Sequence, residues 1–467
     1  MTPRSYFYCG FTTTLNIILH ALTFCKFLWL EGRVSNGIFR NWARRFKYEP
    51  ENFVLPSTEE EIINIVKTSS SVRLFGAGHS FNDGVVSDFT LISLDNYKGI
   101  VSEDLANNRV TFRGGTRMRE VIKLLLDRGL AFSSLPSHDA QSIAGIISTD
   151  VHGTGKNWGF VSELVHSIKV IDGKGDVHVC EQTDELFGAA IGGVGAVGII
   201  CEVTVNAVER FNIEQICIMK KLDEVESELE QLIQDNDHVS LYIFPFAEKC
   251  QINIWNKSPK PQSFLGDLRE FINISLDALT SAWFGNLMAY TGTLKKFSNI
   301  AYYFKQTTDL VLESAQGYTR TIYPLHQEFE FTVPYEESTE RCKQFLKLFE
   351  NMYLAEPKEL PYTLLEVRFT PADRTKALVG AGQGGRRCWI DLICNDTHGF
   401  EKYYEAADQI IHEIKARPHL GKFGTSFTKS YLAELYGANF DKFLHLMHHH
   451  DPEDKFANAL TRRLFRD

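Results

Sequence analysis

The 467-residue sequence lacks any long run of lysine or arginine, and basic residues are fewer than acidic ones, 49 against 59. A nucleic-acid partner would require a basic face to bind phosphate groups. The net charge of −10 therefore argues against nucleic acid as a partner. The sequence also lacks internal repeats and low-complexity tracts. Its length is sufficient for two or three ordinary globular domains.

Cysteine and histidine show little of the spacing that metal sites require. None of the nine cysteines stands in a CxxC pair, and their number is odd. This predicts reduced, mostly buried thiols and neither a disulfide framework nor a zinc site. The histidines at 448–450 precede Asp451, but no second group of ligands accompanies them. We interpret them as a solvated helix end and predict no metal.

A long apolar run occurs only near the N-terminus, in FTTTLNIILHALTFCKFLWL at 11–30. It is long enough to cross a bilayer, but Asn16, His20 and Lys26 are costly in hydrocarbon. The single preceding arginine and the lack of a small-residue cleavage site make a secretory signal weak. Two interpretations of residues 1–41 stay open. Either the segment contacts a membrane as an anchor or surface helix, or it is a helix packed on the rest of this protein, which would then be cytoplasmic.

The residue pattern of the rest of the chain changes twice, near residues 209 and 415. Residues 42–208 mix short strands with helices, one of which starts at Ser57 or Thr58 as its cap. Between 209 and 414, charged helices alternate with strands such as VSLYIFPF, CQINIWN and CWIDLIC. This predicts a second domain with a sheet covered by helices. Small and basic residues return in 415–467, and we expect this segment to rejoin the first domain, giving an α+β fold overall.

Three glycine-rich turns stand out in the first domain. GGVGAVG at 192–198 satisfies GxGxxG, but a helix precedes it and a strand follows. This order is the reverse of a dinucleotide fingerprint, so we interpret the segment as a glycine-rich helix-to-strand turn, which could still present backbone amides to a ligand. LFGAGHSFNDG and TDVHGTG each combine a glycine turn with a histidine, His79 and His152. Their repeated occurrence favours a ligand site over isolated structural turns.

Two further motifs carry charged groups. LLEVRF places Glu366 and Arg368 on one face of a strand, because alternate side chains point the same way. Their apolar neighbours indicate a covered strand, where such a pair could bind hydroxyls and move a proton. HLGK places Lys422 after a glycine, and taken alone it would be a solvated lysine.

Taken in order, GAGHSFND, LPSHDAQSIAGIISTDVHGTG, GGVGAVGII, EVRF and HLGKF resemble the flavoproteins of vanillyl-alcohol-oxidase type. Within that superfamily the sequence is most similar to the alditol, gulonolactone and arabinonolactone oxidases. The resemblance runs from about residue 41 to the end. It implies a two-domain FAD-linked oxidase fold, with a PCMH-type FAD-binding domain and a cap domain whose sheet is flanked by helices.

The resemblance also implies a reaction and its residues. The expected reaction oxidises a CH–OH group of a sugar, polyol or aldonolactone by hydride transfer to flavin N5, with oxygen or another acceptor taking up the electrons. His79 matches a histidine that carries the flavin covalently. Glu366, Arg368 and Lys422 match the catalytic residues. The expected cofactor-binding residues are Gly76, Ala77, Gly78, His79, Ser80, Asn82, Ser137, Ser142, Ile143, Ala144, Gly145, His152, Gly153, Ile199 and His419.

Three positions depart from the pattern of the resembled oxidases. Leu420 replaces a tryptophan, and Pro136 stands where the relatives carry a small residue linked to oxygen access. The second departure leaves open whether oxygen is the acceptor. Asp391 replaces a histidine of the cap, which leaves polyol specificity open. Two alternatives remain: oxidation of a lipid-linked sugar, as in decaprenylphosphoryl-ribose oxidase, or a flavin-fold protein without turnover.

Overall fold

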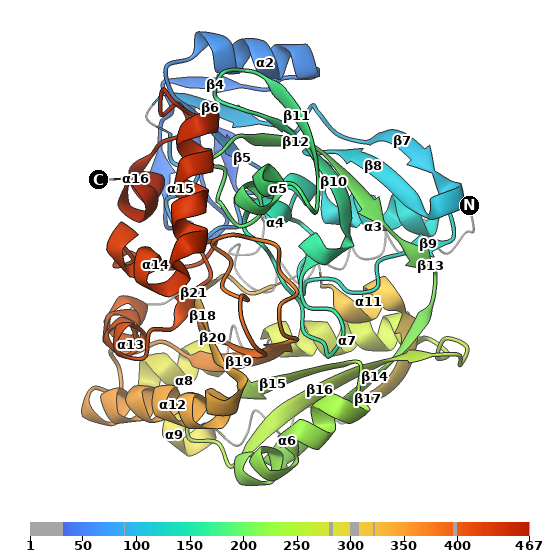
Figure 1. The fold of residues 1–467 in the computed structure, drawn as a ribbon. Coiled ribbons are helices and arrows are strands. Elements are labelled where there is room, and N and C mark those ends of the chain that lie inside the picture. The colour runs from blue at the N-terminus through green and yellow to red at the C-terminus, as the bar shows by residue number, and fades with distance from the viewer. Residues whose placement is uncertain are drawn as a thin grey trace.

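The structure is a computed structural model, and it describes residues 31–87, 89–279, 284–298, 308–320, 323–395 and 399–466. The apolar segment predicted at 11–30 lies outside these ranges. Among the described residues, no helix combines the length and the apolar character needed to cross a bilayer. The described residues form two stacked bodies (Figure 1), with the first and last helices, α2 (Glu59–Thr68) and α16 (Ala459–Phe465), in the upper body and the sheet from the middle of the sequence in the lower one.

The upper body begins with small sheets around a glycine turn. Thr58, one of the two residues predicted as the cap, caps its first helix. Its Oγ1 accepts a hydrogen bond from Glu61 N at 3.2 Å. Ile62 and Val66 of that helix are buried. The elements are β1 (Arg33–Ser35), β2 (Ile38–Arg40), β3 (Lys47–Tyr48), β4 (Asn52–Val54), α2 (Glu59–Thr68), β5 (Val72–Phe75) and β6 (Thr90–Ser93). β4 and β5 each pair with β6 in parallel, and the turn at 76–79 follows β5 directly.

A five-stranded antiparallel sheet of order β11-β10-β12-β8-β7 forms the rest of the upper body. Its strands and helices are β7 (Ile100–Asp104), β8 (Arg109–Arg113), α3 (Met118–Leu126), α4 (Ile143–Ser148), β10 (Val165–Ile171), β11 (Val177–Glu181), α5 (Glu185–Ala190) and β12 (Ile199–Asn206). The short pair β9 (Leu130–Ala131) and β13 (Val208–Glu209) leads to the second body. α4 packs on β12, which places the GGVGAVG turn beside α4.

The lower body is an eight-stranded antiparallel sheet of order β17-β14-β16-β15-β19-β20-β18-β21. Its strands are β14 (Asn212–Lys221), β15 (His238–Ile243), β16 (Lys249–Ser258), β17 (Thr308–Glu313), β18 (His326–Pro334), β19 (Thr363–Thr370), β20 (Arg387–Asn395) and β21 (Arg417–Pro418). Its helices are α6 (Leu222–Asp235), α7 (Gly266–Leu279), α8 (Asn286–Thr291), α9 (Leu294–Phe297), α11 (Ser314–Tyr318), α12 (Ser338–Ala355) and α13 (Phe400–Glu413). The sheet flanked by helices is therefore as the sequence predicts.

The two faces of this sheet differ because polar and apolar residues alternate along its strands. On one face, Phe331 packs on Phe345 of α12 with ring centroids 4.8 Å apart. Phe329 packs on Tyr404 of α13 at 5.5 Å. The other face carries Glu330, and the strand register sets it beside Asp391, which is itself beside Glu366. A row of carboxylates thus crosses three strands on the face that meets the upper body.

The C-terminal segment contacts both bodies. β21 pairs with β18 in the lower sheet, whereas α15 (Ala438–His450) packs on α5 of the upper body. α14 (Lys429–Tyr436) and α16 (Ala459–Phe465) complete the segment. Asn458 Nδ2 donates to the carbonyl of Gly84 at 3.1 Å, which joins the segment to the loop after the glycine turn. The domain boundaries at 42, 209 and 415 stay predictions.

The interpretation of residues 448–450 as a solvated helix end is wrong for one of the three histidines. His448 and His449 are exposed, but His450 is buried and its Nδ1 lies 3.2 Å from Asp172 Oδ2. The helical repeat turns His450 toward the same side as buried Met447. The turn after β10 meets it there, a contact between parts of the chain that are remote in sequence.

Candidate active site

A cavity of about 1480 Å³ lies between the upper body and the lower sheet. The predicted residues that line it are Gly76, Ala77, Gly78, His79, Ser80, Asn82, Ser137, Ser142, Ala144, Gly145, His152, Ile199, Arg368, His419 and Lys422. The other three predicted residues do not line this cavity. Ile143 is buried in the hydrophobic core, and Gly153 and Glu366 line an adjoining cavity instead.

Close packing explains the glycines of the turn after β5. A Cβ atom on Gly76 would lie 2.0 Å from Ser142 Oγ, at the start of α4. Gly78 has a φ of +64°, and a Cβ there would lie 2.9 Å from Gly32 Cα. A side chain at either position would push apart the segments that form the cavity wall.

The same turn directs His79 into the cavity wall. Its ring stacks on Trp42, with centroids 5.1 Å apart and an interplanar angle of 22°. The edge of His138 meets it at 4.4 Å. The GGVGAVG turn closes another part of the wall through Val194, Gly195 and Gly198. Both turns thus line the cavity, including GGVGAVG, for which the sequence taken alone favours a structural turn.

Glu366 and Arg368 form a two-pronged ion pair on β19. Arg368 Nε donates to Glu366 Oε1 at 2.9 Å, and Nη2 lies 2.7 Å from Oε2. Burial opposes the charge of Arg368, but Glu366 and other nearby carboxylates raise its pKa above the ordinary value. Arg368 Nη2 also donates to Ser137 Oγ at 3.2 Å. Arg368 is therefore charged, and the pair is buried and fixed at the boundary between the two bodies.

A second cavity of about 570 Å³ adjoins the first at this ion pair. Ser137, Tyr323 and Arg368 line both cavities. The other polar residues around the second cavity are Ser134, Thr154, His238, Ser240, Tyr242, Asn253, Tyr318, Arg320 and Glu366. Burial raises the pKa of Tyr323 to about 12, so its hydroxyl stays protonated, and it donates to the Ser137 carbonyl at 2.6 Å. Such a wall offers many hydrogen bonds to a hydroxyl-rich molecule.

Most of the polar residues around the second cavity are not predicted from the sequence. Their signal is the alternation of residues along β15 and β16, where Ser240 and Tyr242 face the same side as Asn253. β15 is paired with β19, and Tyr242 is in register with Glu366. The alternation is visible in the sequence, but the pairing that brings these strands to Glu366 is not.

Lys422 occupies a cluster of carboxylates at the other end of the row. It contacts Glu328 directly and lies 3.7 Å from both Glu330 Oε2 and Asp391 Oδ2. Burial opposes its charge, but the surrounding carboxylates raise its pKa above that of an ordinary lysine. Lys422 is therefore a fixed cation and not the solvated lysine of its isolated motif. Glu328 and Glu330 were not singled out from the sequence, although they alternate with buried Phe329 and Phe331.

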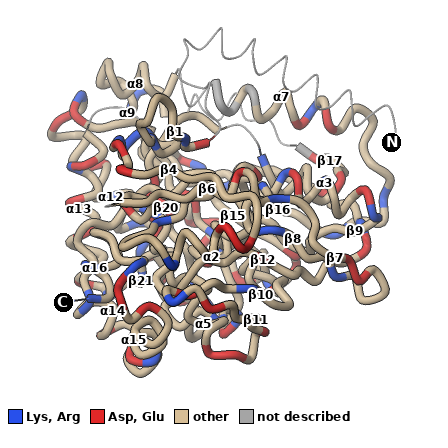
Figure 2. The backbone as a smooth tube through the Cα atoms, turned by 90° about the horizontal axis from the view of Figure 1, so that it is seen from above, with Lys and Arg blue, Asp and Glu red and all other residues tan. Residues whose placement is uncertain are grey.

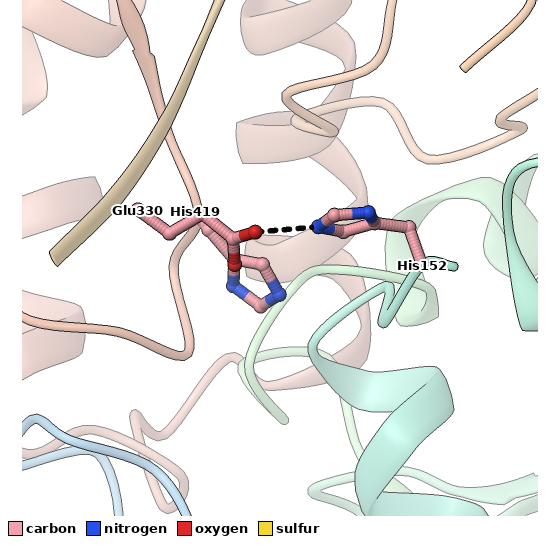
Figure 3. A group of neighbouring side chains, drawn as sticks. All are labelled: His152, Glu330 and His419. Atoms are coloured by element: carbon pink, nitrogen blue, oxygen red, sulfur yellow. Dashed lines mark hydrogen bonds and ion pairs between the residues drawn. The ribbon is translucent and has the colours of Figure 1, made fainter. Parts of the chain in front are cut away.

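Glu330 connects the cluster to two histidines of the cavity (Figure 3). One of its oxygens points at His152 Nε2, 3.0 Å away, and the ring of His419 lies alongside. Burial lowers the pKa of His419 to about 3, so this imidazole is neutral. These residues could together offer ligands to a metal, but the Lys422 ammonium already supplies a positive charge to Glu330. The trio is better described as the hydrogen-bonded floor of the cavity.

Asp391 differs from its neighbours in having no donor. Both of its carboxyl oxygens are buried without a hydrogen-bond partner among the described side chains and backbone. Burial and the neighbouring Glu328 raise its pKa well above the ordinary value. Asp391 is accordingly a neutral acid between Glu330 and Glu366.

Comparison with known proteins defines the class of protein first. The structure superposes on cholesterol oxidase from Brevibacterium sterolicum with a TM-score of 0.75 at 14% identity, covering 93% of this chain and 97% of that one. A variant of that enzyme, His121Ala, gives a TM-score of 0.74 at 16% identity over 93% and 98% of the two chains. The FAD binding domain family matches residues 50–181. The chain therefore has the two-domain fold of FAD-dependent oxidoreductases, and FAD as the cofactor is confirmed.

The particular family follows from the second half of the chain. The D-arabinono-1,4-lactone oxidase family matches residues 203–464, and the chain belongs to this family. L-gulono-1,4-lactone dehydrogenase from Mycobacterium tuberculosis is 26% identical over 91% of this chain and 99% of its own length. L-gulonolactone oxidase from Scyliorhinus torazame is 23% identical over 91% and 98%. D-arabinono-1,4-lactone oxidase from Candida glabrata is 32% identical over 50% and 46%.

The cavity fits FAD on its own features. It runs between the glycine turns of the upper body and the charged face of the lower sheet, so one ligand could contact both. Its walls combine apolar side chains such as Leu74 and Ile199 with the exposed backbone of two glycine turns. Gln141 offers a buried Oε1 that accepts no hydrogen bond from the described residues. The wall formed by the lower sheet adds the fixed charge of Lys422.

Proposed function

We propose that the protein oxidises a CH–OH group of an aldono-1,4-lactone or a closely related sugar lactone. The observation that carries this proposal is the Glu366–Arg368 pair, at the point where the larger cavity meets a second, strongly polar one. The names of the relatives support a lactone as the substrate. The many hydrogen-bonding side chains around the second cavity support a hydroxylated molecule.

In this proposal each residue has a defined task. FAD, when bound, supplies the acceptor for a hydride. Arg368 and Tyr323 hold oxygens of the substrate at the mouth shared by the two cavities. Glu366 receives the proton of the substrate hydroxyl, since its carboxyl group lies at that mouth beside Arg368. Lys422 provides a fixed positive charge that stabilises negative charge developing in the cavity.

Anaerobic reduction of the flavin tests the proposal. The purified holoenzyme is mixed with aldono-1,4-lactones, alditols or a lipid-linked pentose, and the flavin absorbance is followed. We expect bleaching by one or more lactones, and recovery when air is admitted if oxygen is the acceptor. Glu366→Gln serves as the matched control, retaining flavin without bleaching. Bleaching by the lipid-linked sugar alone, or by none of these compounds, would contradict the proposal.

We further propose that His79 carries the flavin covalently. Its ring is held against Trp42 at the wall of the FAD cavity, which supports a fixed attachment point. Acid-denatured protein should keep its yellow colour in the pellet, and His79→Ala should release FAD into the supernatant. Free FAD from the wild-type chain would contradict the covalent bond without affecting the lactone proposal.

We also propose that residues 11–30 hold the protein on a membrane. Their apolar composition supports this. The full chain should sediment with membranes, and a chain that begins at residue 31 should not. Equal distribution of the two chains would contradict the proposal.

A further inference from the structure

A second group of convergent side chains lies outside both cavities. Asp172 follows β10, His178 lies on β11, and His450 ends α15. Asp172 Oδ2 accepts hydrogen bonds from His178 Nε2 at 2.9 Å and from His450 Nδ1 at 3.2 Å. The backbone N–H of Gly173 donates to the His450 carbonyl at 2.8 Å. The hairpin and the end of the helix are therefore held together at this point.

The backbone fixes the direction of the carboxylate. Asp172 Oδ1 accepts the N–H groups of Lys174 and Asp176, both at 3.0 Å, so Oδ2 faces the two imidazoles. The three ligand atoms all lie within 4.8 Å of one another. Tetrahedral zinc with ligands at about 2.0 Å has ligand atoms about 3.3 Å apart. The two measured N···O distances already approach that value.

The charges of the cluster also suit a cation. Asp172 is buried, and both of its oxygens accept hydrogen bonds, Oδ1 from two backbone N–H groups and Oδ2 from the two imidazoles. Lys174 Nζ lies 3.9 Å from Oδ2 and opposes a further cation, but its side chain is 39% exposed and can turn toward solvent. The side chain of His178 is 32% exposed, which leaves a path from solvent to the cluster.

We propose that Asp172, His178 and His450 form a site for a divalent transition-metal ion, with Zn²⁺ as the preferred occupant. Each imidazole would coordinate the ion through the nitrogen that now faces Oδ2, and the proton on that nitrogen would move to the other ring nitrogen or to water. Water from the exposed side completes the coordination. Two imidazoles and a carboxylate favour Zn²⁺, Ni²⁺ or Cu²⁺ over Ca²⁺ and Mg²⁺, which prefer oxygen ligands. The Oδ1 hydrogen bonds to the backbone orient the carboxylate as outer-shell contacts do in known metal sites. The ion would fasten α15 to the β10–β11 hairpin.

Calorimetric titration of the chelator-treated holoenzyme, prepared without an affinity tag, tests the site. We expect one Zn²⁺ per chain and no heat of binding for Mg²⁺ or Ca²⁺. His178→Gln and His450→Gln should each weaken Zn²⁺ binding by about 10-fold or more, a loss typical of altered metal sites. Lys174→Met should tighten binding, because it removes the opposing ammonium. None of these residues lines either cavity, so lactone turnover should be unchanged.

The run of histidines offers matched controls. His448→Gln and His449→Gln remove exposed imidazoles from the same helix end and should leave the affinity within about 2-fold, as expected of surface substitutions. Equal weakening by these two variants would show adventitious binding to the run and overturn the site. Absence of stoichiometric Zn²⁺ binding to the wild type would also overturn it. If His450→Gln does not fold, His178→Gln decides the outcome, since its side chain is partly exposed.

Discussion

The two walls of the FAD cavity are built in different ways. The wall from the upper body consists largely of backbone and small residues, such as Gly76, Gly78 and Gly195. The wall from the lower sheet presents charged side chains on paired strands, chiefly Glu330, Arg368 and the adjacent Lys422. Backbone can approach a large cofactor closely, whereas charged side chains can bind a hydroxyl and take its proton. The comparison predicts that damage to the first wall affects cofactor binding, and damage to the second affects turnover.

The charges are distributed differently in the molecule as a whole. Basic and acidic residues are scattered among uncharged ones over the described chain (Figure 2). Inside the site, by contrast, Glu328, Glu330, Glu366 and Asp391 gather around Arg368 and Lys422. Burial first, and then the neighbouring carboxylates, raise the pKa of Asp391.

The largest effect is expected at the charged wall. Glu366→Gln keeps the shape of the side chain but removes the carboxylate that we propose receives the proton. Loss of a general base typically lowers turnover by about 10²–10⁴-fold, so kcat should fall in that range while flavin content stays at the wild-type level. The visible absorbance of the purified variant and its steady-state kinetics measure both quantities. A variant that loses flavin together with activity would show that the two walls are not separate in function.

The next largest effect is expected at the backbone wall. Gly76→Ala places a Cβ 2.0 Å from Ser142 Oγ, and overpacking of this kind costs about 1–3 kcal/mol. We expect lower flavin occupancy and a lower unfolding temperature, with near-normal turnover per bound flavin. Adding Ser142→Gly should restore part of both, because it removes the clashing side chain. Full occupancy in Gly76→Ala alone would contradict the close packing of this turn.

Asp391 sharpens the comparison within the charged wall. Its pKa is raised in the folded protein. Above the ordinary pKa of aspartate, the unfolded chain loses this proton and the folded chain keeps it, so the free energy of unfolding decreases as the pH rises. Asp391→Asn mimics the neutral acid and does not titrate. The stability of the wild type relative to this variant should therefore fall as the pH rises from about 4 toward neutrality. Urea unfolding at several pH values measures the difference, and a difference that is independent of pH would contradict a protonated Asp391.

The two walls also differ in how well they can be predicted from the sequence. The glycine–histidine turn is a local feature, so Gly76, Gly78 and His79 were identified from their neighbours in the chain. Glu366 and Arg368 were identified for the same reason, because they lie two residues apart on one strand. Glu328 and Glu330 were missed, since their place beside Asp391 depends on the register of β18 with β20. Likewise, burial of His450 depends on the remote turn that carries Asp172.

The smallest effect is expected away from both walls, at the cap of α2. Thr58→Ala removes the hydroxyl that accepts the Glu61 N–H, and loss of such a cap costs about 1 kcal/mol. Thr58→Ser keeps the hydroxyl and is the matched control. α2 shares a core cluster with β5, which leads into the glycine turn. This variant therefore tests whether a loss of stability in α2 alone changes the cavity wall. We expect a lower unfolding temperature with unchanged flavin content and turnover, whereas loss of flavin would show that the backbone wall depends on the stability of its supporting helix.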